Sequence, residues 1–266
     1  MDSCLNSKSA YIFERRYEDL PSGYYDYDVL KYWEKMIGQE AISCLPQAYG
    51  KQINELLFFN NQLNQDYKDS VKIQQVDEMI KLYRENVWKE QSILFHGERD
   101  LIFYTFSIPF IQCASFALIH RVSEIIVRCV LKDMQQMLAQ RLSAVATGTL
   151  IYEMQLFKNQ NKLKGDSPEK QYDYFCDSIL SNPNYIEELF SVYPCLQRAI
   201  FECLANCVNN YVEFLCRLKK DHTQLVKKFC ANKEFKDLVS CSSGASDSHN
   251  GGKSVTIFTL DNGTRV

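Results

Sequence analysis

The stretch SDSHNGGKSVTIFTLDNGTRV, residues 246–266, joins a glycine-rich loop to the clearest strand pattern in the chain. Its side chains alternate between two faces as in a β-strand, one face carrying Val255, Ile257 and Thr259 and the other Thr256, Phe258 and Leu260. Asn262 and Gly263 predict a type I′ hairpin turn, because both central residues of that turn need a positive φ. Only three residues follow, and so short a return strand cannot hold a hairpin by itself. We therefore expect this hairpin to begin a lobe whose other strands lie beyond residue 266.

Most of the chain before this loop predicts amphipathic helices, because apolar residues recur every three or four positions. The expected helical regions are 28–38, 47–69, 73–95 and 118–157. Two later helices are expected to begin at Ser167-Pro168 and Asn182-Pro183, each a capping residue followed by proline at the first helical position. The polar segment 158–170 is the clearest internal break and reads as a linker.

A further helix is expected after Pro194, with one apolar stripe of Leu196, Ile200, Leu204, Cys207, Tyr211, Leu215 and Leu218. The whole pattern predicts a mainly α fold in two parts. Residues 1–240 form a multi-helix N-terminal region, and residues 241–266 begin a second, β-containing lobe.

The segment 101–119 is apolar enough to raise the question of a membrane span. Pro109, Gln112 and several hydroxyl side chains within it favour a helix or helical hairpin buried in the protein instead. The sequence leaves both interpretations open, with burial preferred and membrane contact not expected.

Composition indicates a globular protein with no general attraction for nucleic acid or anionic membranes, since the net charge is −3. The 11 cysteines lie mostly within apolar helical patterns, and no basic segment followed by an apolar core opens the chain. We therefore expect reduced, buried thiols and a cytoplasmic location.

The string at 246–266 resembles a motif of the class II, LanM-type lanthipeptide synthetases, in which a G/S-D-S-H-N-x-G-K/R-S-V loop and hairpin run into a Y-K-P-R segment. Less specific similarity covers 95–111, 192–202 and 211–230. The chain ends where the Y-K-P-R segment would start, so we expect an N-terminal fragment of the dehydratase domain, cut before its kinase-like lysine.

This resemblance implies a chemistry and a set of partners. A kinase-like dehydratase phosphorylates Ser and Thr of a ribosomal precursor peptide with ATP and Mg²⁺, and then eliminates phosphate to leave dehydroamino acids. The expected partners are the leader and core of that peptide, and the remainder of the synthetase if the gene is split. ATP and Mg²⁺ belong to the complete enzyme. The fragment alone is expected to bind neither tightly and to be inactive.

By the same resemblance, Asp247 and His249 serve the elimination step, and Ser248, Asn250, Gly251 and Gly252 complete a phosphate loop. The chemistry suits these residues, because β-elimination needs a base for the α-proton and stabilisation of the leaving phosphate. Two glycines also let backbone N–H groups approach a phosphate. The alternative is a surface loop that only caps the hairpin.

Two further alternatives concern the rest of the chain. Cys203, Cys207 and Cys216 could face a metal ion, but cysteines on an apolar stripe are more often core residues, and we expect no metal site. As a function from another class, the chain could be a non-catalytic helical interaction module or the remnant of a split gene.

Overall fold

The computed structural model describes residues 38–49, 71–86, 101–122, 128–247 and 251–266, together with positions 34, 89 and 249. The chain divides into two compact units, residues 1–74 and 75–266. In the first unit the described helix is α2 (Gln39–Tyr49), which buries Ile42. The helices predicted at 28–38 and 47–69 fall almost entirely outside the described residues.

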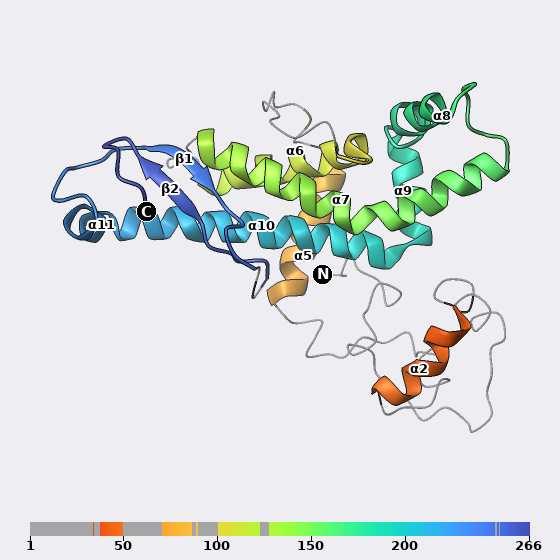
Figure 1. Cartoon of the computed structure of the whole chain (residues 1–266), viewed down its shortest axis with the longest axis horizontal. Helices are drawn as coiled ribbons and strands as arrows, with labels where there is room; N and C mark the ends of the chain where they lie inside the picture. Colours follow the sequence, from red (N-terminus) through yellow and green to blue (C-terminus); the bar gives the residue numbers. More distant parts are fainter. Residues whose placement is uncertain are drawn as a thin grey trace. The chain divides into compact units, whose positions relative to one another are not determined.

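The second unit is mainly helical and ends in a small antiparallel sheet, which confirms the predicted class of fold (Figure 1). Its elements in chain order are α5 (Val71–Glu85, which begins in the first unit), α6 (Tyr104–Arg121), α7 (Arg128–Asn159), α8 (Pro168–Tyr174), the π-helix η4 (Phe175–Ile179), α9 (Pro183–Val192), α10 (Pro194–Lys220), α11 (His222–Lys228), β1 (Leu238–Ser242) and β2 (Ile257–Leu260).

Three long helices form the centre of this unit, since α6, α7 and α10 all pack against one another. Helix α10 buries the predicted stripe from Leu196 to Leu215, with Leu218 half-buried beyond it. Aromatic side chains fill the space around α6. The Phe110 ring lies 5.9 Å from those of Phe190 and Phe201. The core is therefore built from helix faces on which apolar residues recur every three or four positions.

The helix predicted over 118–157 is wrong as a single element. Helix α6 ends at Arg121, where Val122 leaves helical geometry, and α7 begins only at Arg128. The break allows α6 to pack against α7, which one continuous helix could not do. On α7 the buried side chains recur every four residues, at Val130, Met134, Leu138, Leu142, Ala146 and Leu150, so Val145 lies off this face and is 36% exposed.

The apolar segment 101–119 is the buried helix that its polar residues favoured. Phe106, Phe110 and Ile111 are completely buried in α6, and Pro109 lies within the helix. Among the described residues no helix combines the length and apolar character that crossing a membrane requires.

Local signals at helix ends were largely correct. The Ser167 hydroxyl accepts a hydrogen bond from the Lys170 N–H at 3.3 Å, and the Asn182 side chain accepts one from the Asn184 N–H at 3.0 Å. Helix α5, predicted to reach residue 95, ends at Glu85 because Asn86 takes a left-handed conformation with φ 57°.

The C-terminal hairpin differs from its prediction in two ways. Asn262 does not have a positive φ. Instead, the Gly263 N–H donates a hydrogen bond to the Leu260 carbonyl and closes a turn, and Gly263 itself has a φ of 87°. The hairpin loop therefore has three residues, with glycine at the left-handed position. In addition, β2 does not lack a partner. It pairs with β1 on one edge, and residues 264–266 bond to it on the other, with Phe258 and Val266 exchanging two hydrogen bonds of 2.9 Å.

The sheet rests on the helices through the face that the alternation predicted. Phe258 and Leu260 are buried, while Val255 on the opposite face is 55% exposed. The Phe258 ring meets Phe214 of α10 at 5.6 Å, and β1 packs against α7. The sheet thus packs on α7 and α10 at one surface, where the glycine-rich loop also lies.

Candidate functional site

The glycine-rich loop between β1 and β2 is held onto two helices by its own carbonyl groups. Asn210 of α10 donates to the Gly251 carbonyl at 3.1 Å, and Arg141 of α7 donates to the Gly252 carbonyl at 2.8 Å. Both glycines have positive φ, 78° and 85°, which side chains of L-residues rarely allow. A Cβ atom at Gly252 would lie 2.2 Å from Arg141 Nη1. The loop therefore needs glycine for conformation and, at position 252, for space.

Two of the predicted site residues lie on the outside of this loop. The side chains of Asp247 and His249 are exposed, and the His249 backbone forms a two-bond bridge with Lys253 at 2.8 and 2.7 Å. Ser248 and Asn250 lie outside the described residues. The structure thus places Asp247 and His249 in one solvent-facing loop.

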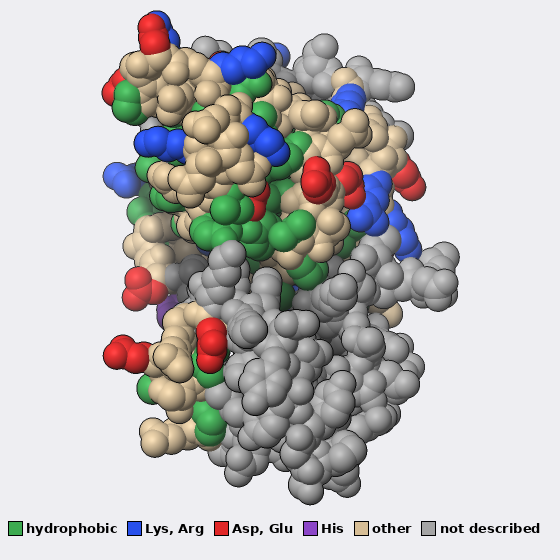
Figure 2. All heavy atoms as spheres, turned by 90° about the vertical axis from the view of Figure 1, so that its right-hand side faces the viewer, with side chains coloured by type: hydrophobic (Ala, Val, Ile, Leu, Met, Phe, Trp, Pro, Cys, Tyr) green, Lys and Arg blue, Asp and Glu red, His purple; other side chains and the backbone are tan. Residues whose placement is uncertain are grey.

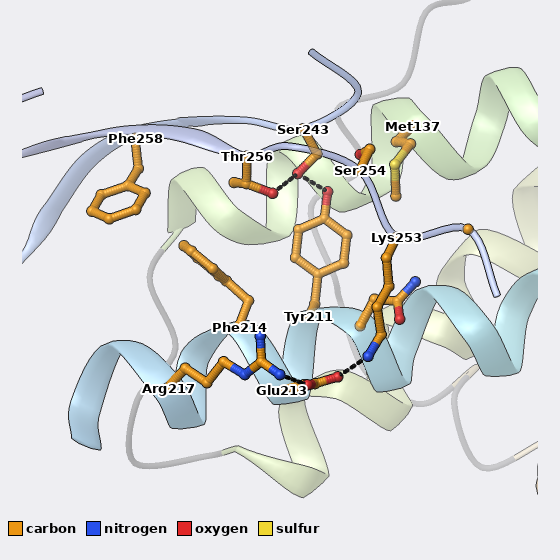
Figure 3. A pocket seen from close by; sticks show the side chains of 12 residues that line it. Met137, Tyr211, Glu213, Phe214, Arg217, Ser243, Lys253, Ser254, Thr256 and Phe258 are labelled. Carbon is orange, nitrogen blue, oxygen red and sulfur yellow. Dashed lines mark hydrogen bonds and ion pairs between the residues drawn. The ribbon is translucent and has the colours of Figure 1, made fainter. Parts of the chain in front are cut away.

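A pocket of about 340 Å³ lies beside the loop, between α10, α7 and the sheet (Figure 3). Its walls combine apolar, hydroxyl and charged side chains. They are Met137, Asn210, Tyr211, Glu213, Phe214, Arg217, Ser243, Gly252, Lys253, Ser254, Thr256 and Phe258. The pocket therefore borders Gly252, the last glycine of the loop.

Three charged side chains form one edge of this pocket. The Glu213 carboxylate binds the Lys253 ammonium at 2.5 Å through one oxygen and the Arg217 guanidinium through the other. The hydrogen bond from Lys253 and the nearby charge of Arg217 lower the pKa of the Glu213 carboxyl. Two cations and one anion leave this edge with a local charge of +1, counted from these three groups.

A chain of hydroxyl groups connects the opposite wall to a carboxylate on α7. Asp133 accepts a hydrogen bond of 2.7 Å from the Tyr211 hydroxyl, which lies 3.1 Å from Ser243 Oγ. Ser243 Oγ in turn lies 3.1 Å from Thr256 Oγ1, and the Ser243 N–H donates to both Asp133 oxygens. Burial, with the nearby Cys207 and Asp133, raises the pKa of Tyr211, which keeps it a neutral donor. Asp133 thereby ties the end of β1 to α7.

The cysteines considered as metal ligands have different surroundings. Cys207 is fully buried, and burial raises the pKa of its thiol to about 12, so it remains protonated in the core. Cys203 is half-buried and Cys216 is exposed. Within the described residues, no three His, Cys, Asp or Glu side chains stand close enough together to hold a metal ion.

A second pocket of about 570 Å³ lies between α5, α6 and α9, with the Arg84–Glu187 ion pair at its edge. At the α8 end of the molecule, shown in Figure 2, described side chains of both charge signs are scattered rather than gathered by sign. The described residues on that face therefore form no patch of one charge.

Sequence reasoning found the loop but missed the groups that support it. Arg141, Asp133 and Glu213 lie on helices, where single charged residues next to an apolar stripe look like ordinary solvated positions. Tyr211 was assigned to the core stripe alone, although its hydroxyl belongs to the polar network. Lys253 was read only as part of the motif. None of these carried a local signal that distinguishes a pocket residue from a surface one.

Comparison with known families adds one match. Residues 193–266, which span α10, α11, the loop and both strands, match the model of a family described as a domain of unknown function, DUF4135. No curated protein matches the chain. The matched segment contains Glu213, Arg217 and Lys253, whereas Asp133 and Arg141 on α7 lie outside it.

Proposed function

We propose that this chain supplies the helical region and the elimination loop of a lanthipeptide synthetase dehydratase with a kinase-like catalytic lobe. The observation that carries the proposal is the loop itself. Its D-S-H-N-G-G sequence resembles that family, and its backbone is held by Arg141 and Asn210 while Asp247 and His249 face solvent. A loop held by its glycine carbonyl groups, with acid and imidazole side chains exposed, suits a reaction on a peptide that binds from outside.

The proposed reaction starts from a phosphorylated Ser or Thr in the precursor peptide. A base removes the α-proton, the electron pair of the Cα–H bond forms the Cα=Cβ double bond, and the Cβ–O bond breaks as phosphate leaves. The imidazole of His249 is a suitable base for this step, and Asp247 provides a carboxylate in the same loop. The products are a dehydroamino acid and inorganic phosphate, and no oxidant or reductant is needed.

The preceding phosphorylation would use ATP and Mg²⁺, and the described residues do not fit a magnesium site, since they offer no cluster of carboxylate or imidazole ligands. In the proposal, the lysine and metal ligands for γ-phosphate transfer come from the segments that the family resemblance places after the hairpin.

The test uses the complete dehydratase, in which this chain is joined to those segments, with Asp247→Ala and His249→Ala as the variants. Asp173→Ala, an exposed carboxylate on α8, is the matched control. We expect both loop variants to accumulate phosphopeptide, because phosphorylation proceeds and elimination slows. Mass spectrometry separates the two steps, since phosphate addition raises the peptide mass and net loss of water lowers it.

Two outcomes would count against the proposal. Unmodified peptide from a folded loop variant would assign that residue to ATP handling rather than elimination. Fully dehydrated peptide from both variants would make the loop structural, as expected for a hairpin cap in a non-catalytic helical module.

A further inference from the structure

The charged edge of the 340 Å³ pocket resembles an anion-binding site in which a carboxylate of the protein, that of Glu213, takes the place of the ligand. Lys253 and Arg217 come from different elements, the loop and α10, yet both contact the single carboxylate of Glu213 (Figure 3). The three side chains remain 45%, 69% and 36% exposed, respectively. Ion pairs this exposed contribute little to stability, so a ligand can exchange with the carboxylate at small cost.

The position of Lys253 links this edge to the elimination loop. Lys253 and His249 face each other across an antiparallel bridge with backbone bonds of 2.7 and 2.8 Å. Residues directly opposite in such a bridge project from the same face, with Cβ atoms roughly 5 Å apart. The Lys253 and His249 side chains therefore leave the loop from the same face of this bridge.

The rest of the pocket suits the carbon part of a ligand. Met137, Phe214 and Phe258 contribute apolar surface to the lining, and the two phenylalanine rings meet edge to face at 5.6 Å. Ser254 and Thr256 place hydroxyl groups on the wall next to the loop. The volume exceeds that of a phosphate group alone, and the carbonyl groups of Gly251 and Gly252 already accept hydrogen bonds from Asn210 and Arg141.

We propose that this pocket is a subsite for the phosphate monoester of a phosphorylated peptide, bound by Lys253 and Arg217, with Glu213 as an internal placeholder that the phosphate displaces. A phosphate monoester carries about −1.5 to −2 charges at pH 7, against −1 for a carboxylate, and it can bind a guanidinium through two oxygens. Until the ligand arrives, Glu213 keeps both cations oriented. The identity of the ligand as a peptide rests on the proposed function, whereas the anion site rests on the pocket geometry.

The subsite gives elimination a place for its leaving group. Phosphate that leaves Cβ would remain paired with Lys253 and Arg217, so its developing charge would be stabilised beside the loop that carries His249. Lys253 and Arg217 would then contact the reacting phosphate, while Glu213 acts by positioning them.

The test measures binding to the chain itself by isothermal titration calorimetry without magnesium. The probes are a phosphoserine peptide, the same peptide without phosphate, inorganic phosphate and ATP. Relative to the unaltered chain, Lys253→Met should weaken binding of the phosphopeptide roughly tenfold, and Glu213→Gln should strengthen it roughly threefold or more. Lys228→Met removes an exposed charge of the same kind from α11 and should leave the affinity unchanged.

Each other outcome has a defined meaning. Equal affinity in Lys253→Met, Glu213→Gln and the unaltered chain would overturn the subsite. Equal affinity for the peptide with and without phosphate would do the same, and binding of ATP alone would make this a nucleotide pocket instead. Binding of inorganic phosphate as tightly as the phosphopeptide would retain the anion site and overturn the peptide as its source.

The inference can fail separately from the proposed function. In the complete dehydratase, Lys253→Met should also accumulate phosphopeptide. If Asp247→Ala and His249→Ala block elimination while Lys253→Met does not, the loop remains catalytic and the phosphate subsite is wrong. If Lys253→Met loses phosphopeptide affinity while all three variants dehydrate normally, the subsite is present and the elimination role is wrong.

Discussion

Replacing Gly252 with alanine should destabilise the chain by about 3 kcal/mol, and the structure separates this cost into two parts. The first part is conformational. Gly252 and Gly244 have nearly the same φ, 85° and 84°, and for an L-residue the left-handed region costs about 1–2 kcal/mol, offset by about 0.4–1 kcal/mol of lost freedom in the unfolded chain. Gly244→Ala, whose Cβ would meet nothing within 4 Å, should therefore cost only about 1 kcal/mol.

The second part is steric and belongs to Gly252 alone. A Cβ there would lie 2.2 Å from Arg141 Nη1, so the guanidinium must move away and lose its 2.8 Å hydrogen bond to the Gly252 carbonyl. A hydrogen bond to a charged group contributes about 1.5–3 kcal/mol, and Arg141 is only half-buried, which places the expected loss near 2 kcal/mol. The sum of both parts is about 3 kcal/mol.

A double-mutant cycle with Arg141→Ala tests this division. With the guanidinium absent, Gly252→Ala should cost no more than Gly244→Ala, which gives a coupling energy near 2 kcal/mol between positions 141 and 252. Urea unfolding followed by circular dichroism measures all four members of the cycle. The reasoning is refuted if Gly252→Ala and Gly244→Ala cost the same in the unaltered chain, or if the Gly252 and Arg141 replacements are additive.

Two further predictions concern the pocket. Asp133→Ala should lower the free energy of unfolding by about 2–4 kcal/mol, because it removes the acceptor of the Ser243 N–H and leaves the buried Tyr211 hydroxyl only Ser243 Oγ as a partner. Asp133→Asn should cost less. Urea unfolding measures both, and equal costs would contradict a role for acceptor geometry. The pKa of Glu213 is lower in the folded chain than its value of about 4.5 in the unfolded chain. Its ion pairs therefore stabilise the folded chain at pH values above about 4.5, and this contribution is lost as the pH falls through the folded pKa. Melting temperatures of the unaltered chain and Glu213→Gln should therefore converge in acid and separate above about pH 5, and parallel curves would show that the pairs add nothing to stability.

Much of the fold follows from local chemistry and was predictable from the sequence. Ser167 and Asn182 cap helices because a short polar side chain before proline satisfies free N–H groups at the first turn. Phe258 and Leu260 face the helices because alternate residues of a strand point to opposite sides. The stripe from Leu196 to Leu215 is buried because its spacing follows the helical period. The sequence also showed that the D-S-H-N-G-G segment is an unusual, glycine-dependent loop.

Only the tertiary structure decided which distant groups meet that loop. Arg141 contacts Gly252 across 111 positions, and Asp133 contacts Ser243 across 110, because α7 packs beside α10 and presents one face to the sheet. The partner of β2 was equally nonlocal: β1 is only five residues long and ends in Ser-Cys-Ser, so its local sequence does not show that it pairs with β2. Periodicity determines which face of an element is buried, but not which other element covers it. The pocket, its charged edge and the groups that hold the loop depend on which element covers each buried face.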